Sequence, residues 1–245
     1  MNSQIDDVLQ QMTDELRTVT SPAHRVFLQT YQRTTAAVGK AVRGGEFEDP
    51  GWVSAWDVVF AELYLSALRA YYQDQRAGVP RPWRLAFAAP PELPALRHVL
   101  LGINAHINYD LPQALLAVIS DADFEDEELI QRRRRDHERI DAVLSQRVAA
   151  EDAVLSSTSA RSLLDRALAP LNRLSSRRFL REARQKVWQN TETLHQARLE
   201  SPQRYSERLA ELEVLSAAKI ADLLAPGQVL LRLSVAGFGV LIPAD

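Results

Sequence analysis

Two segments of the chain begin with a helix-capping side chain directly before a proline, at Ser21-Pro22 and at Asp49-Pro50. A serine or aspartate at the N-cap accepts a hydrogen bond from a backbone N–H of the first turn, and the proline lacks an N–H that would be unsatisfied there. Apolar residues recur at helical spacing after both pairs. The sequence therefore predicts two long helices, one up to about residue 43 and one up to about residue 76.

The helical period continues through most of the remaining chain. We expect a short helix over about 83–88 and a central helix over about 95–109, which Pro112 ends or kinks because proline lacks the N–H of the helical ladder. The segment 229–242 alternates weakly and can be a strand, an extended arm or a helix. Further helices are expected over 112–119, 128–150, 162–173, 176–199 and 202–224.

These patterns together predict an all-α, single-domain multi-helix bundle over residues 1–245, with a buried, kinked central helix. Residues 226–245 are the part that could instead form an extended C-terminal tail. A chain of 245 residues can bury a substantial core in one domain, and 46% hydrophobic with 25% charged residues is typical of a soluble globular protein.

Charge and composition also limit the function. The net charge of −3 disfavours nucleic acid as a partner, and the absence of cysteine excludes disulfides, a thiolate nucleophile and cysteine-based metal sites. Residues 1–17 lack the apolar core of a secretory signal, and no window resembles a membrane span. We expect a cytoplasmic protein with a small-molecule substrate and no nucleic-acid or membrane partner, present as a monomer or homodimer.

Four polar residues lie inside the predicted central helix, where their neighbours are apolar: Asn104, His106, Asn108 and Asp110. Burying an unpaired amide or carboxylate costs about 1 to 3 kcal/mol, so these residues indicate a polar network, a metal site or an active site. Residues four apart share a face of a helix. His106 is therefore expected beside Asp110, and Asn104 beside Asn108 on another side of the helix.

Two further helices each direct a carboxylate toward the core, at Asp57 and at Asp136. Facing helices of a bundle assemble metal sites in this way, so His106, Asp110, Asp57 and Asp136 are the candidate catalytic residues and also candidate ligands of one divalent ion, Zn, Mn, Fe or Mg. Each also has a structural interpretation. Asp110 can cap the helix that Pro112 begins, His106 can donate to a backbone carbonyl, and Asp136 can pair with an arginine.

Polar and aromatic residues at other inward positions are the candidate substrate-binding groups: Asn104, Asn108, Tyr64, Tyr109, Arg184 and Trp188. Arg184 and Trp188 share a helix face and could hold an anionic ligand by charge and stacking. The sequence contains no serine-hydrolase elbow, phosphate-binding loop or dinucleotide fingerprint.

Three hypotheses for the function remain open. The first is a metal-assisted hydrolase or lyase. The second is a metal-free acid–base cyclase, isomerase or dehydratase of an apolar metabolite. The third is a non-catalytic ligand-binding or scaffold protein, in which the buried polar residues only specify how the helices pack.

The stretch Gly102-Ile-Asn-Ala-His-Ile-Asn-Tyr-Asp-Leu111 resembles the G-x-N-A-H-I-x-x-D-L core of a bacterial family known as a domain of unknown function. Phe60, Tyr64, Arg184 and Trp188 stand at similar positions around it, and the resemblance spans most of the chain. It implies no established activity.

The His106 and Asp110 pair also faintly resembles the helical H-x-x-x-D pair of the zinc-dependent phospholipase C and P1 nuclease group. Residues 113–115, Gln-Ala-Leu, stand where that group has Gln-Pro-Leu, and the other expected histidines and an N-terminal tryptophan ligand are missing. The resemblance therefore implies no trinuclear zinc site.

Overall fold

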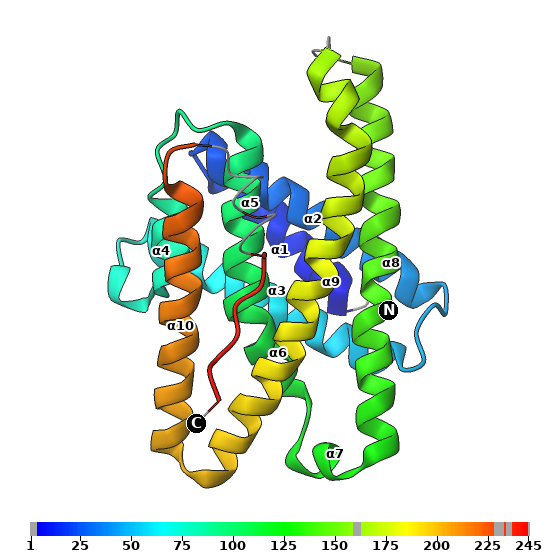
Figure 1. The fold of residues 1–245 in the computed structure, drawn as a ribbon, viewed down its shortest axis with the longest axis vertical. Coiled ribbons are helices and arrows are strands. Elements are labelled where there is room, and N and C mark those ends of the chain that lie inside the picture. Colours follow the sequence, from blue (N-terminus) through cyan, green and yellow to red (C-terminus); the bar gives the residue numbers. More distant parts are fainter. Residues whose placement is uncertain (1–3, 159–162, 228–232, 234–236, 245) are drawn as a thin grey trace.

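The computed structural model describes residues 4–158, 163–227, 233 and 237–244, and the side chains among them except those of Arg76, Asp141 and residues 144–180. In this part of the chain the regular elements are helices, which confirms the predicted all-α multi-helix fold (Figure 1). In chain order they are α1 (Gln4–Thr18), α2 (Pro22–Arg43), α3 (Pro50–Tyr72), the 3₁₀ turn η1 (Arg76–Gly78), α4 (Arg81–Phe87), α5 (Ala95–Ala105), the π-helical turn η2 (His106–Asp110), α6 (Leu111–Val118), α7 (Asp121–Glu125), α8 (Glu127–Thr158), α9 (Leu163–Glu200) and α10 (Pro202–Leu224).

The predicted helix starts are found where the caps indicate. Ser21 before α2, Asp49 before α3 and Ser201 before α10 each accept a hydrogen bond from the backbone N–H three residues later, at 3.5, 2.9 and 3.0 Å. Helix α3 ends at Tyr72 rather than near residue 76. Asp74 shortly after it adopts a φ of 57°, a left-handed conformation that a continuing helix does not contain.

Several elements differ from the sequence-based expectation. The short helix α7 was not predicted, and α8 continues to Thr158 where a helix ending near residue 150 was expected. Helix α1 was not predicted, yet its Ile5, Val8 and Met12 are at most 1% exposed, and burying each of them contributes roughly 1.5 to 3 kcal/mol. The separate helices expected over 162–173 and 176–199 are one helix, α9. The part of the expected 229–242 segment that is described, from residue 237 onward, is neither helix nor strand.

The central helical segment, α5–η2–α6, runs between the other elements (Figure 1). Helix α5 packs against α2, α6 packs against α3 and α9, and α10 packs against α4 and α9. Helices α8 and α9 lie side by side, and their far ends extend beyond the rest of the bundle (Figure 1). Among the described residues, no helix is both long and apolar enough to cross a membrane.

A glycine sets how closely α5 approaches α2. A Cβ atom at Gly102 would lie 2.3 Å from Cδ2 of Phe27, far inside van der Waals contact, so only glycine fits without moving that ring. This close approach brings the next turn of the central segment, which carries His106, against the aromatic residues of α2 and α3.

The central segment adapts to Pro112 through the π-helical turn η2. The N–H of Leu111 donates to the carbonyl of His106, five residues back, where an α-helix would use the residue four back. Turns of this kind often occur at functional sites. The Asp110 side chain makes no capping hydrogen bond, so the interpretation of Asp110 as an N-cap is wrong, and its carboxyl group is used elsewhere.

Candidate functional site

His106 and Asp110 form a buried pair across the π-helical turn. The distance between His106 Nδ1 and Asp110 Oδ2 is 2.8 Å, and the indole N–H of Trp83 donates to the same carboxyl oxygen, also at 2.8 Å. The two residues are only 3% and 2% exposed. The four-residue spacing predicted this contact, but it gave no sign that Trp83 on α4 would join it.

Burial favours the neutral form of both partners. It lowers the pKa of His106 well below its ordinary value, and it raises the pKa of Asp110 well above its own, against the opposing effect of the Trp83 hydrogen bond. In the neutral pair the Asp110 O–H donates to Nδ1, so the imidazole proton stands on Nε2. That Nε2 atom has no hydrogen-bond partner among the described residues.

Aromatic rings from three helices enclose the imidazole. Phe60 stacks on it, with centroids 3.5 Å apart and planes 5° apart, and Tyr31 meets it edge-on at 4.5 Å. The rings of Tyr64 and Trp83 both lie 5.9 Å away. Because these rings fix the plane of the imidazole, they also fix the direction of its free nitrogen.

Asp57 lies one turn before Phe60 on α3 and is 3% exposed. Its Oδ2 atom has no hydrogen-bond partner in the described part of the chain, and burial raises the pKa of its carboxyl group to about 7. The pKa of Tyr31 is raised as well, first by burial and then by the charge of Asp57. Near neutral pH this carboxyl group is therefore present in both its protonated and its ionised form.

Three neighbouring side chains each present a buried polar atom without a partner among the described residues. They are the hydroxyl of Tyr64, Oδ2 of Asp57 and Nε2 of His106. The hydroxyls of Tyr31 and Thr35, which lie beside them, interact with each other. These five residues and Asp110 are here called the His106 site. More than about 90% of buried polar groups in proteins are hydrogen-bonded, so the three unpaired atoms indicate a place for water or a polar ligand.

Sequence reasoning missed part of this site. Tyr31 and Thr35 were not singled out, although their four-residue spacing places two hydroxyls on the apolar face of α2 that also carries Phe27. That face was the available signal. Trp83 was not among the predicted site residues either, yet its N–H donates to Asp110.

Asp136 is buried as predicted, but it serves a different structure. Its carboxylate accepts hydrogen bonds from the backbone N–H groups of Glu48 and Asp49, at 2.8 and 2.7 Å, and from Arg139 at 3.1 Å. It therefore holds the loop that leads into α3. In the described part of the chain, no three His, Cys, Asp or Glu side chains are grouped so as to hold a metal ion, so His106, Asp110, Asp57 and Asp136 are not gathered into one such group.

The predicted amide pair faces away from the His106 site. Asn104 and Asn108 both donate from Nδ2 to the carbonyl of Phe238, each at 3.1 Å. Tyr109 belongs to a separate apolar cluster that includes Leu212. These three predicted substrate-binding residues therefore contact other parts of the chain.

Arg184 and Trp188 lie on α9 against α8. Arg184 donates to the backbone carbonyl of His137, and the Trp188 indole N–H donates to Glu192 at 2.8 Å. The Trp188 ring lies 5.6 Å from that of His137. Of the six predicted substrate-binding residues, Tyr64 is the one whose side chain the structure places in the His106 site.

Comparison with known proteins agrees with the resemblance to a family of unknown function. No curated protein and no solved structure matches the chain, and the likeness to the zinc-dependent phospholipase C and P1 nuclease group stays a prediction. The family match covers residues 5–226, which include every residue of the His106 site. The chain belongs to DUF5995, a family of unknown function.

Proposed function

We propose that the chain is a metal-free acid–base enzyme, of the isomerase, dehydratase or cyclase type, acting on a small and largely apolar metabolite. The observation that carries the proposal is the pair of unpartnered atoms, Nε2 of His106 and Oδ2 of Asp57, in one buried aromatic core. Burial shifts the pKa values of these two groups in opposite directions, and shifts set by the surroundings are how enzymes assign acid and base roles to titratable groups.

The protonation states suggest a role for each group. Ionised Asp57 takes a proton from a carbon of the substrate, while His106 donates its Nε2 proton to the substrate oxygen. As that proton leaves, the Asp110 proton moves to Nδ1, so the imidazole stays neutral and Asp110 becomes the carboxylate. A proton taken up at Nε2, return of the Nδ1 proton to Asp110 and release of the Asp57 proton restore the starting state.

The surroundings favour an apolar substrate with few polar groups. Phe27, Phe60 and Trp83 supply ring surfaces, and only the hydroxyl, carboxyl and imidazole groups of the His106 site offer hydrogen bonds. Because the site residues are nearly inaccessible, helices must separate to admit a substrate, and closure then excludes water.

The two other hypotheses have less support. A catalytic zinc ion needs about three protein ligands, and the unpaired ligand atoms here are those of His106 and Asp57. A purely structural network is expected to satisfy its own hydrogen bonds, whereas the Tyr64 hydroxyl, Oδ2 of Asp57 and Nε2 of His106 have no partner among the described residues.

The test compares two histidine variants. His24 is a matched control, because its ring nitrogens contact Tyr72 Oη at 3.0 Å and the Phe87 carbonyl at 2.9 Å, so neither is free. Purified wild-type protein, His106→Gln and His24→Gln are each incubated with a metabolite extract, and substrate loss is followed by mass spectrometry.

We expect the wild-type protein to convert a metabolite, and His106→Gln to remain folded but to convert it about 10² to 10⁴ times more slowly. His24→Gln should lose stability and keep the conversion rate. Unchanged conversion by His106→Gln, or no conversion of any compound by the wild-type protein, would contradict the proposal.

A further inference from the structure

The segment 237–244 runs between α9 and α10 (Figure 1). It is held by side chains of the central helix, α9 and α10, and the set of these side chains is here called the groove: Asn104, Asn108, Glu182, Lys186, Asn190 and Arg208. Side chains of the surrounding helices bind its backbone. Asn108 donates to the Phe238 carbonyl at 3.1 Å and accepts from the Val240 N–H at 3.2 Å. Asn190 repeats this pattern two residues later, donating to the Val240 carbonyl at 3.0 Å and accepting from the Ile242 N–H at 2.9 Å.

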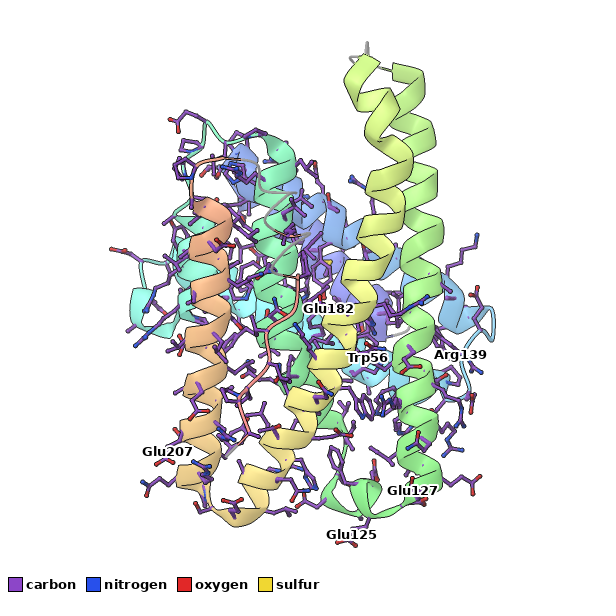
Figure 2. The ribbon with its side chains drawn as sticks, viewed as in Figure 1. Trp56, Glu125, Glu127, Arg139, Glu182 and Glu207 are labelled. Carbon is purple, nitrogen blue, oxygen red and sulfur yellow. The ribbon has the colours of Figure 1, made fainter. Side chains whose placement is uncertain are left out.

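Charged side chains complete the set of contacts. Glu182 on α9 accepts from the N–H groups of Phe238 and Gly239, at 3.0 and 3.4 Å (Figure 2). Lys186 donates to the Gly239 carbonyl at 3.1 Å, and Arg208 on α10 donates to the Pro243 carbonyl at 2.9 Å. The groove thus makes hydrogen bonds to the backbone of every second residue of an extended segment, as peptide-binding proteins do.

Side chains of the segment add sequence preference. Phe238 and Ile242 are each 3% exposed, whereas Leu241 between them is 43% exposed, which matches the alternation of an extended chain. Gly239 lies against α9, where an added Cβ would be 2.8 Å from the Cα of Ala183. Gly237 has a φ of 70°, which favours glycine. The pattern selected is glycine, aromatic, glycine, then aliphatic residues.

The family match includes the residues of the groove but not the segment that occupies it. Asn104, Asn108, Glu182, Asn190 and Arg208 lie within the matched residues 5–226, and the segment lies outside them. We propose that this groove is a binding site for an extended Gly-aromatic-Gly-aliphatic peptide, and that residues 237–243 are a ligand held in cis that the same peptide supplied in trans can replace. This inference does not depend on the chemistry of the His106 site.

The test uses the full chain with the substitution Gly239→Val. The valine side chain would clash with α9 and keep residues 237–243 out of the groove, whereas the residues that form the groove are unchanged. The probe is a fluorescent peptide of residues 237–245, followed by anisotropy. We expect it to bind Gly239→Val at least tenfold more tightly than the wild-type protein, whose groove is filled. Adding Asn190→Ala to Gly239→Val should weaken binding at least tenfold, and a peptide that itself carries valine in place of Gly239 should not bind.

If folded Gly239→Val does not bind the wild-type peptide, the segment is an inseparable part of the fold and the inference is wrong. A second experiment covers the case in which Gly239→Val does not fold. A protease site is inserted after Gly227 in the otherwise wild-type chain, which is cleaved and mixed with the labelled peptide. Native mass spectrometry then shows whether the labelled peptide replaces the cleaved fragment. Replacement supports the inference that the segment is a separable ligand, and retention of the fragment without exchange overturns that inference.

Discussion

Asp57 is a carboxyl group in an aromatic core, and its Oδ2 atom has no hydrogen-bond partner among the described residues. Burial raises its pKa from 3.8 to about 7, so the folded protein binds this proton more tightly than the unfolded chain does. The free energy of unfolding must then fall as the pH rises from about 4 to about 7, where the unfolded chain has already released the proton. At higher pH the full cost of burying the charge remains.

Asp57→Asn should remove this dependence. A shift of about three pKa units corresponds to about 4 kcal/mol, so the variant should be more stable than the wild-type protein at pH 8 by up to that amount, and the difference should shrink toward pH 4. Urea denaturation at several pH values measures it. Asp110 and the buried histidines are present in both proteins, so their contributions cancel when the two free energies of unfolding are subtracted. If the difference in the free energy of unfolding did not change with pH, the raised pKa of Asp57 would be contradicted.

At the residue scale, sequence patterns predicted which side chains point into the core better than they predicted which groups those side chains contact. Helical spacing placed His106 beside Asp110 and turned Asp57 and Asp136 inward, and all four are buried. It could not show that Asp136 meets the backbone N–H groups of residues 48 and 49, because that contact joins positions nearly 90 residues apart. The hydroxyls of Tyr31 and Thr35 were missed although both lie on the apolar face of α2. Their spacing was a local signal, but the helices that this face packs against were not predictable from it.

At the element scale, the packing of α5 on α2 makes Gly102 sensitive to a single methyl group. Gly102→Ala would place a Cβ 2.3 Å from the Phe27 ring, and overpacking of this kind typically costs about 1 to 3 kcal/mol. Gly51→Ala is the matched control, because Gly51 is exposed in the first turn of α3 and its nearest neighbour would be 3.5 Å away.

Denaturation midpoints should therefore fall for Gly102→Ala and stay level or rise slightly for Gly51→Ala, since alanine favours a helix over glycine by about 0.5 to 1 kcal/mol. Equal effects of the two substitutions would mean that α5 does not approach α2 through Gly102.

Local signals predicted elements well where a cap and a periodic apolar face coincide, as in α2 and α10. Helix α1 was missed although Ile5, Val8 and Met12 recur at the three- and four-residue spacing of one helix face. That spacing was the available signal. The π-helical turn could not be predicted. Pro112 indicated an irregularity, and the contacts of the central segment with its neighbours determine which one forms.

At the scale of the whole molecule, opposite sides of one helical segment serve two sites. His106 and Asp110 face the aromatic core, and Asn104 and Asn108 hold the segment 237–244. The sequence predicted this two-sided polarity from the spacing alone. It could not predict that one side would bind an extended segment more than 100 residues away, because nothing in a local pattern identifies a distant backbone partner.

The proposed chemistry depends on an Asp57 carboxyl group that ionises near neutral pH and on a His106 imidazole that is neutral there. Isotope-edited NMR titration of the wild-type protein measures both protonation states directly. We predict that the Asp57 carboxyl group titrates with a pKa of about 7, while the His106 imidazole, whose pKa burial lowers, is neutral at neutral pH with its proton on Nε2. A charged His106 imidazolium at neutral pH, beside an Asp57 that is fully ionised at its ordinary pKa, would contradict the proposed roles of both residues.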